Sequence, residues 1–226
     1  MTSHEATALM IHGGWEGHSP AESVDIMVPA LEEGGFKVSV ESSLEVYADE
    51  DFISQFSVIV QNWTMGEILP DELRGLVSAV KRGTGLAGWH GGIVDSFRMA
   101  TDYLQMIGGQ FAAHPHDIVD YEVNIKPEQR DNPIIGGIPD FSVHSEQYWI
   151  LADPLSEVLA TTTIPVREDD PWHQPVESPV LWTRQWGKGR VFVNAIGHTL
   201  GDLVVPEFQQ LTVRGVRWAA GLEPQR

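Results

Sequence analysis

The 226-residue sequence contains no cysteine. This absence excludes disulfide bonds, metal sites built from thiolates and any mechanism that needs a thiol nucleophile. Basic residues are scarce: 14 lysines and arginines stand against 32 aspartates and glutamates, which gives a net charge of −18 at pH 7. So acidic a surface repels phosphate backbones and anionic membranes, and we expect neither nucleic acid nor membrane among the partners. Solubility or a salt-rich habitat is a sufficient explanation for the acidity itself.

Long apolar runs are also missing, and none approaches the roughly 20 residues that a membrane-spanning helix needs. The segment from Met1 to Ala8 lacks a basic region followed by an apolar stretch, so we expect no signal peptide. A cytoplasmic location follows as the expectation. With 42% hydrophobic and 20% charged residues, the composition is that of an ordinary globular protein, and we expect residues 1–226 to form a single domain.

Several motifs that would assign a reaction are absent. The sequence has no phosphate-binding loop with its lysine, and no dinucleotide-binding fingerprint opens a helix after the first expected strand. A Gly-x-Ser-x-Gly elbow is missing as well. Nucleotide binding and serine-based hydrolysis are therefore not expected.

Short apolar runs alternate with amphipathic segments in the first half of the sequence. Strands are expected at residues 7–11, 36–40, 57–60 and 85–89. Helices are expected at residues 20–33 and 70–82, and one further helix after residue 92 is expected to include Phe97 and Ile107. This alternation predicts an α/β fold with a parallel sheet covered by helices. The second half is richer in strands, expected at residues 117–125, in part of 141–150, and at residues 155–164, 179–186 and 190–196, before a final helix from Pro206.

The segment Gly85–Gly92 is an apolar run that ends in a glycine-lined turn, with His90 at its tip. Glycines permit tight backbone geometry and leave a neighbouring side chain accessible to a ligand. Two other expected strands run into His12 and Asn62. Because ligands bind beyond the carboxyl ends of parallel strands, we expect the three loops to share one cleft.

Histidines are the main candidates for chemistry in this cleft. Among nine histidines, His90, His114 and His198 are expected to converge on one site with Glu146. Histidine suits acid–base catalysis near neutral pH, and glutamate can be its partner or the base itself. Any one of these histidines can instead be a loop or capping residue. The same three histidines with a carboxylate would also suit zinc or another divalent cation, although His114 and His116 are the only close pair in the sequence.

Eight tryptophans are many for this length. Trp15, Trp63 and Trp89 lie at or next to the expected loop edge, where flat rings are suited to stacking against the CH faces of sugars. Packing in the core is the alternative for Trp63 and Trp89, because large aromatic side chains also dominate protein interiors.

Several blocks of sequence together resemble one known family. They are Gly88-Trp89-His90-Gly91-Gly92, residues 103–111 with His114-Pro115, Glu146-Gln147-Tyr148, residues 179–184, residues 187–192, Gly197-His198-Thr199 and residues 216–221. These blocks resemble the trehalose-utilisation ThuA-like family, and they extend over nearly the whole chain. The resemblance implies a class I glutamine-amidotransferase-like fold, which is a flavodoxin-like three-layer sandwich with a mainly parallel sheet.

The resemblance also implies a pathway, the catabolism of trehalose and related disaccharides, alongside oxidoreductases that make 3-keto sugars. Amidotransferases of this fold carry a cysteine at the elbow where this sequence has His90, so glutamine hydrolysis by the thiol route is excluded. Matching positions for functional residues are His90, His114, Glu146, Trp182, Arg184 and His198. The acidic residue that the family has before the glutamate is Ser145 here, which argues against a mechanism with paired carboxylates.

The resulting hypothesis is an enzyme that acts on a disaccharide or 3-keto sugar by acid–base chemistry. The candidate catalytic residues are His90, Glu146 and His198; the candidate substrate-binding residues are His12, Trp63, Trp89, His114, Trp182 and Arg184; the candidate metal ligands are His90, His114 and His198. A non-catalytic sugar-binding or regulatory protein and a metal-dependent hydrolase are the alternatives. A homodimer is the expected assembly, since it is the commonest one, and a pathway oxidoreductase is a possible partner.

Overall fold

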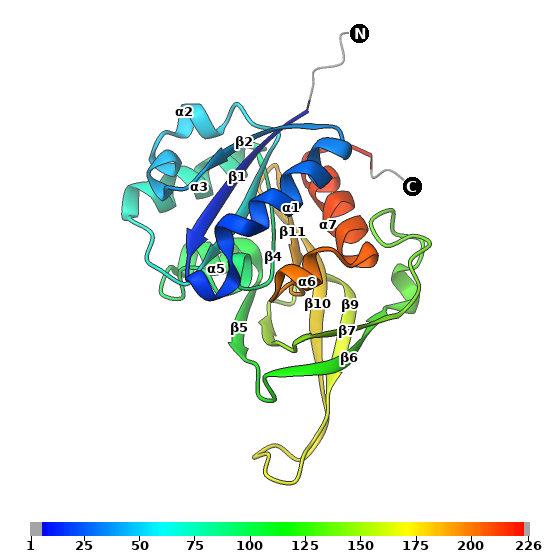
Figure 1. The fold of residues 1–226 in the computed structure, drawn as a ribbon. Helices are drawn as coiled ribbons and strands as arrows, with labels where there is room; N and C mark the ends of the chain where they lie inside the picture. The colour runs from blue at the N-terminus through cyan, green and yellow to red at the C-terminus, as the bar shows by residue number, and fades with distance from the viewer. Residues whose placement is uncertain (1–5, 224–226) are drawn as a thin grey trace.

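The computed structural model describes residues 6–223, so most of the N-terminal segment that was considered for a signal peptide lies outside the described residues. Within the described part, nine strands form one sheet in the order β2-β1-β3-β4-β11-β10-β9-β6-β7, and two short strands, β5 and β8, pair separately (Figure 1). The fold is mixed α/β, as expected.

One half of the large sheet is parallel. Its strands are β1 (Ala6–Gly14), β2 (Phe36–Glu41), β3 (Val58–Thr64), β4 (Gly85–Trp89) and β11 (Gly189–Asn194). Parallel strands that are covered on both faces are recognised as continuous apolar runs. The run Val58-Ile59-Val60 is such a case, since all three side chains are fully buried. The carboxyl ends of these five strands therefore meet at one edge.

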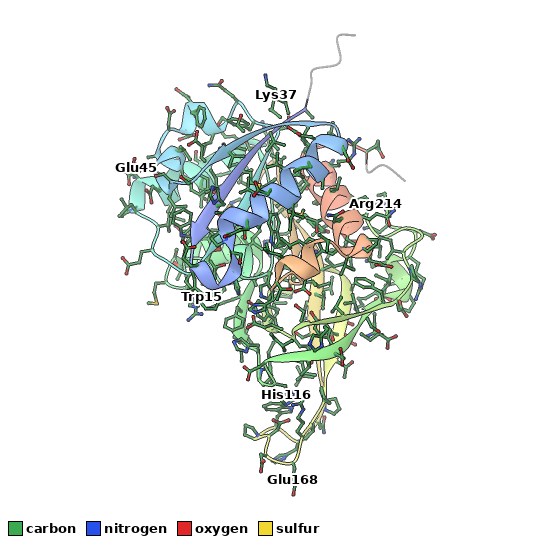
Figure 2. The ribbon with its side chains drawn as sticks, in the orientation of Figure 1. Trp15, Lys37, Glu45, His116, Glu168 and Arg214 are labelled. Carbon is green, nitrogen blue, oxygen red and sulfur yellow. The ribbon has the colours of Figure 1, made fainter. Side chains whose placement is uncertain are left out.

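The other half of the sheet is antiparallel. It contains β6 (Ile118–Ile125), β7 (Phe141–Glu146), β9 (Glu157–Ile164) and β10 (Val176–Trp186), while β5 (Gly109–Ala113) pairs with β8 (Trp149–Ala152). The region 141–150 thus contains two strands in different sheets. The β9–β10 hairpin projects from the body of the molecule, and an ion pair of 3.0 Å joins His116 to Asp170 near its end (Figure 2).

Helices cover both faces of the parallel half. α1 (Pro20–Glu33) and α7 (Pro206–Ala219) pack in one apolar cluster with the Met10 side of β1, and α2 (Glu50–Ile53), α3 (Pro70–Arg82) and α5 (Thr101–Ile107) pack in a second cluster with the Leu9 side. Shorter helical turns are η1 (Glu16–His18), η2 (Leu44–Ala48), α4 (Gly91–Val94), η3 (Pro127–Gln129) and α6 (Leu200–Leu203). Within residues 6–223, no helix has the length and apolarity required to cross a membrane.

The expectation of one helix after residue 92 is wrong. Helix α4 ends at Val94 and α5 begins at Thr101. Between them, the backbone bonds to the loop after β3: the Met65 N–H donates to the carbonyl of Asp95 (3.0 Å), and the Phe97 N–H donates to the carbonyl of Met65 (3.3 Å). These bonds and the positive φ of Phe97 (49°) are incompatible with a continuous helix.

Candidate functional site

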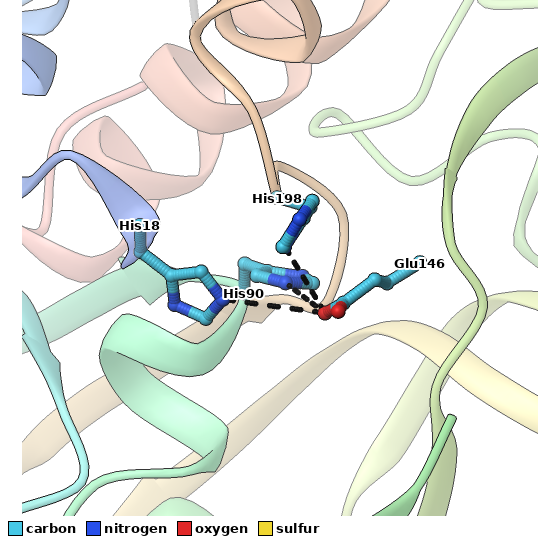
Figure 3. Close-up of side chains that lie close together, drawn as sticks. All are labelled: His18, His90, Glu146 and His198. Carbon is cyan, nitrogen blue, oxygen red and sulfur yellow. Dashed lines mark hydrogen bonds and ion pairs between the residues drawn. The ribbon is translucent and has the colours of Figure 1, made fainter. Parts of the chain in front are cut away.

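Four side chains from distant parts of the sequence converge at the carboxyl edge of the parallel strands. They are His18 on η1 after β1, His90 directly after β4, Glu146 at the end of β7 and His198 in the loop after β11. One potential ligand atom from each lies within 4.8 Å of the others (Figure 3). The strands β1, β4 and β11 all run parallel in one half of the sheet, with β3 between β1 and β4, so their carboxyl ends bring the three imidazoles together.

His18 is the member of this group that the sequence-based candidates did not include. Its Nδ1 lies 2.8 Å from the hydroxyl of Thr64, at the end of β3. The ring passes close to Gly91, where a Cβ would lie 2.5 Å from Cε1 of His18. The signal for His18 was its place in the sequence, in the short segment that follows the first strand at the same edge as His90.

His90 occupies a constrained position at the strand end. Its backbone has φ 46° and ψ −144°, a conformation that side-chain-bearing residues seldom adopt and that is concentrated at functional sites. The Nδ1–H donates to the carbonyl of Ala195 (3.1 Å), and Tyr148 stacks on the ring with centroids 4.1 Å apart. A carbonyl oxygen only accepts, so Nδ1 carries the proton and Nε2 faces the site.

Glu146 is the centre of the group. Its Oε2 lies 3.2 Å from Nε2 of His90, 3.1 Å from Nδ1 of His198 and 4.0 Å from Nε2 of His18 (Figure 3). The other oxygen, Oε1, lies 3.8 Å from Nε2 of His114. One carboxylate therefore faces four imidazoles.

The protonation states follow from burial and from these neighbours. Burial lowers the pKa of His18 to about 3, helped by the nearby His90 and His198, while Glu146 works in the opposite direction. Burial also lowers the pKa of His90, against the effect of its contacts with Glu146 and Ala195. For Glu146, burial works to raise the pKa, but His198 and His90 outweigh it and hold the pKa well below its usual value. Near neutral pH the site thus presents neutral imidazoles at His18 and His90 and an ionised carboxylate at Glu146.

This combination leaves electron pairs facing one another. Neutral His90 directs the lone pair of Nε2 at a carboxylate oxygen 3.2 Å away, an arrangement that is repulsive unless a proton or a cation lies between the two atoms. The buried Nδ1 of His198 lies 3.1 Å from the same carboxylate oxygen but makes no well-oriented hydrogen bond with a described residue. Three imidazoles and one carboxylate are a ligand set for zinc and related divalent cations. The residues present therefore fit such a cation.

Two further side chains form the rim of the site. His114 is half-exposed, and its Nδ1 lies 3.1 Å from a carboxylate oxygen of Asp117. Trp15 is 46% exposed, and its ring contacts that of His18 edge-on, with centroids 4.8 Å apart. The group of four is thus flanked by a partly exposed imidazole and an exposed indole.

Three candidate substrate-binding residues lie in the protein interior, which corrects the expectation for them. Trp89 is 2% exposed and packs against Phe208, and Trp182 is fully buried, with its indole N–H donating to the carbonyl of Ile107 (2.9 Å). The guanidinium of Arg184 is also buried and pairs with Asp153 (3.0 Å). Their burial places all three side chains in the packed interior, which for Trp89 agrees with the alternative of core packing.

His12 and Trp63 lie near this edge but outside the group of four. His12 is paired in register with Asn62 across β1 and β3, and the ligand atoms that converge within 4.8 Å in the described part of the chain do not include it. Trp63 is half-buried, and its ring packs so close to Gly13 that a Cβ there would lie 2.5 Å from it. The structure therefore brings together His90, His114, His198 and Glu146, and adds His18.

Comparisons with known proteins give a consistent picture of the fold. The sequence profile of ThuA, described as trehalose utilisation, matches residues 7–219. A ThuA-like protein from Parabacteroides merdae ATCC 43184 is similar with a TM-score of 0.75 at 17% identity, covering 99% of this chain and 93% of that one. A second ThuA-like protein, from Bacteroides uniformis ATCC 8492, has a TM-score of 0.76 at 15% identity, with 97% and 93% covered.

A protein from Salmonella typhimurium, named cytoplasmic protein STM3548, has a TM-score of 0.64 at 15% identity, covering 95% of this chain and 98% of that one. Identities this low establish likeness of fold alone. No curated protein matches the chain.

Proposed function

The chain belongs to the ThuA family, which is described by trehalose utilisation, and from this premise we propose that it is a divalent-cation-dependent enzyme of sugar catabolism. Its substrate is a disaccharide or a 3-keto derivative of one. The ligands for the cation are His18, His90, Glu146 and His198, and zinc is the first candidate for the metal.

The observation that carries this proposal is the geometry at His90. Its Nδ1 donates to the Ala195 carbonyl, its pKa is lowered, and Nε2 faces an ionised carboxylate oxygen at 3.2 Å. A cation between Nε2 and Oε2 would turn this repulsion into two ligand bonds. Tyr148 supports the ring of His90 from one face and thereby fixes its direction.

A cation held here would supply Lewis-acid polarisation of a carbonyl or hydroxyl oxygen of the sugar. Proton transfer is the role of side chains at the rim. His114 reaches Glu146 at 3.8 Å, is half-exposed and is oriented by Asp117, so it is placed to move a proton between the substrate and solvent. In a 3-keto sugar the hydrogen beside the carbonyl is acidified, and its removal by such a base leads to elimination or isomerisation.

Trp15 is the proposed platform for the sugar ring. It is exposed, it contacts the ligand residue His18, and its backbone N–H donates to the Thr64 carbonyl (3.0 Å), which fixes the loop. Exposed aromatic rings of this kind combine an apolar face with a polar edge, which suits the amphipathic faces of a sugar.

Two other functions use the same residues. Acid–base catalysis by His90 and Glu146 without a metal is one, and sugar binding without catalysis is the other. The first predicts activity that survives a chelator. The second predicts that a saccharide raises the melting temperature while no product is formed.

The test is turnover of trehalose and of a 3-keto disaccharide by protein purified without a metal-affinity tag. We expect product from one of them, loss of activity on dialysis against a chelator, and recovery on addition of a divalent cation. The variant His90→Gln should be inactive. His144→Gln is the matched control, because His144 lies on β7 two residues before Glu146 but is exposed and paired with Asp120 (2.8 Å). Activity unaffected by the chelator would contradict the metal-dependent proposal.

A further inference from the structure

A buried carboxylate lies directly behind the site. Asp202, on α6, is 6% exposed, and its Oδ2 accepts two hydrogen bonds. One comes from the hydroxyl of Ser145 (2.8 Å), and the other comes from the backbone N–H of Thr199 (2.9 Å). Ser145 immediately precedes Glu146, and Thr199 immediately follows His198.

These two bonds join segments that are not otherwise neighbours in the sheet. Strand β7 is the last strand of the antiparallel half, whereas the loop with His198 follows β11 in the parallel half. Ser145 is fully buried, so its bond to the carboxylate is protected from water. The hydroxyl of Tyr121 adds a bond to the carbonyl of Glu146 (3.3 Å), which holds the backbone of that residue from the other side.

We propose that Asp202 is a positioning residue that sets the distance between Glu146 and His198 and thereby tunes the affinity of the site for its cation. This inference rests on the proposed function, since it needs a bound cation. A metal site is tight when its ligands are already in place before the metal arrives, and groups that hold the ligands typically contribute 10- to 100-fold in affinity. Here one oxygen atom, Oδ2 of Asp202, accepts hydrogen bonds from the residues next to two proposed ligands, Glu146 and His198.

A purely structural role for Asp202 is the competing explanation. Asp202 also takes part in a capping box with Thr199 at the start of α6, where its own N–H donates to the Thr199 hydroxyl (3.3 Å). A cap of this kind stabilises a helix without reference to a ligand. The two roles are separable, because Ser145 contributes to the link with β7 and not to the cap.

The experiment measures the dissociation constant for zinc by competition with a chromophoric chelator, alongside the melting temperature of each metal-free variant. Ser145→Ala removes the bond to β7 and leaves the cap intact, and we expect affinity to fall by roughly tenfold. Asp202→Ala removes both bonds to Oδ2 and should weaken binding by at least as much. Thr199→Val removes the capping hydroxyl but keeps the N–H bond to Asp202, and its affinity should stay within about twofold of wild type.

Asp49→Ala is the matched control for loss of a cap. Asp49 accepts from the Phe52 N–H (2.9 Å) at the start of α2, which is also a four-residue helix. We expect a lower melting temperature and unchanged zinc affinity. If Ser145→Ala and Asp202→Ala fold and bind zinc as tightly as wild type, the positioning role is wrong while the metal site stands. If wild-type protein itself fails to bind zinc, manganese or cobalt, the proposed function fails and this inference fails with it.

Discussion

At the scale of single residues, the geometry of His90 depends on contacts that are distant in the sequence. A histidine at a glycine-lined strand end was recognisable in the sequence, but its tautomer was not, because the partner that fixes it is the backbone carbonyl of Ala195, 105 residues away. The same applies to Glu146. Its low pKa depends on His198 and His90, which come from two other elements. Sequence therefore indicated the residue types, while the fold determines their protonation.

Gly91 allows His18 to reach the site. In Gly91→Ala the new Cβ would lie 2.5 Å from Cε1 and 2.9 Å from Nδ1 of His18, so the imidazole must move away from Glu146. We expect the protein to fold and zinc affinity to fall by roughly tenfold or more, the effect typical of a disturbed ligand shell. Calorimetric titration with zinc measures this. The matched control is Gly201→Ala, whose Cβ would meet only the Thr199 hydroxyl at 3.4 Å; equal losses in both variants would contradict the explanation.

At the scale of secondary-structure elements, sequence periodicity located most strands and the long helices. The run at 57–60 and the helix at 70–82 correspond to β3 (Val58–Thr64) and α3 (Pro70–Arg82). Sequence periodicity did not show the break between α4 and α5, because that break comes from hydrogen bonds to Met65, which lies in a loop distant in sequence. It also did not divide 141–150 into β7 and β8, whose partners are β6 and β5. Local pattern predicted these elements, but tertiary contacts decide the break after Val94 and the division of 141–150.

A substitution at Trp182 tests whether this residue belongs to the core or to the site. Its indole fills the space beneath Gly109, and its N–H donates to the Ile107 carbonyl at the end of α5. Trp182→Phe leaves that carbonyl without its donor, and we expect the free energy of unfolding to decrease by about 1–3 kcal/mol. Zinc affinity should not change. Urea unfolding measures the change in stability, and a parallel metal titration measures zinc affinity. A selective loss of zinc or sugar binding at unchanged stability would show that Trp182 belongs to the site.

At the scale of the whole molecule, the site exists because two halves of the sheet meet. The parallel half supplies His18, His90 and His198 at strand ends, and the antiparallel half supplies Glu146. The sequence predicted the shared edge for the loops after β1, β3 and β4, and it also indicated that Glu146 and His198 converge with His90. His18 was missed because η1 has no strong periodicity and contains only three residues.

The stability of the metal-free protein should depend on pH through this site. The pKa of His18 is lowered from 6.5 to about 3, so the unfolded chain binds a proton below pH 6.5 that the folded chain does not. The pKa values of His90 and Glu146 are lowered in the same sense. Stability contributed by these groups is complete above pH 6.5 and is lost as pH falls toward 3. We expect the melting temperature to decrease over this range, and to decrease less steeply in His18→Gln; identical slopes in the two proteins would contradict the assignment of a buried neutral imidazole.

The most direct test of the central claim is the metal content of the untagged protein. Elemental analysis after equilibration with one equivalent of zinc and gel filtration should give close to one zinc per chain for wild type, and X-ray absorption should show nitrogen and oxygen ligands at about 2.0–2.2 Å. His18→Gln and His90→Gln should retain much less, and His144→Gln should match wild type. Wild-type protein that retains no metal, or variants that retain as much as wild type, would contradict the assignment of His18, His90, Glu146 and His198 as a cation site.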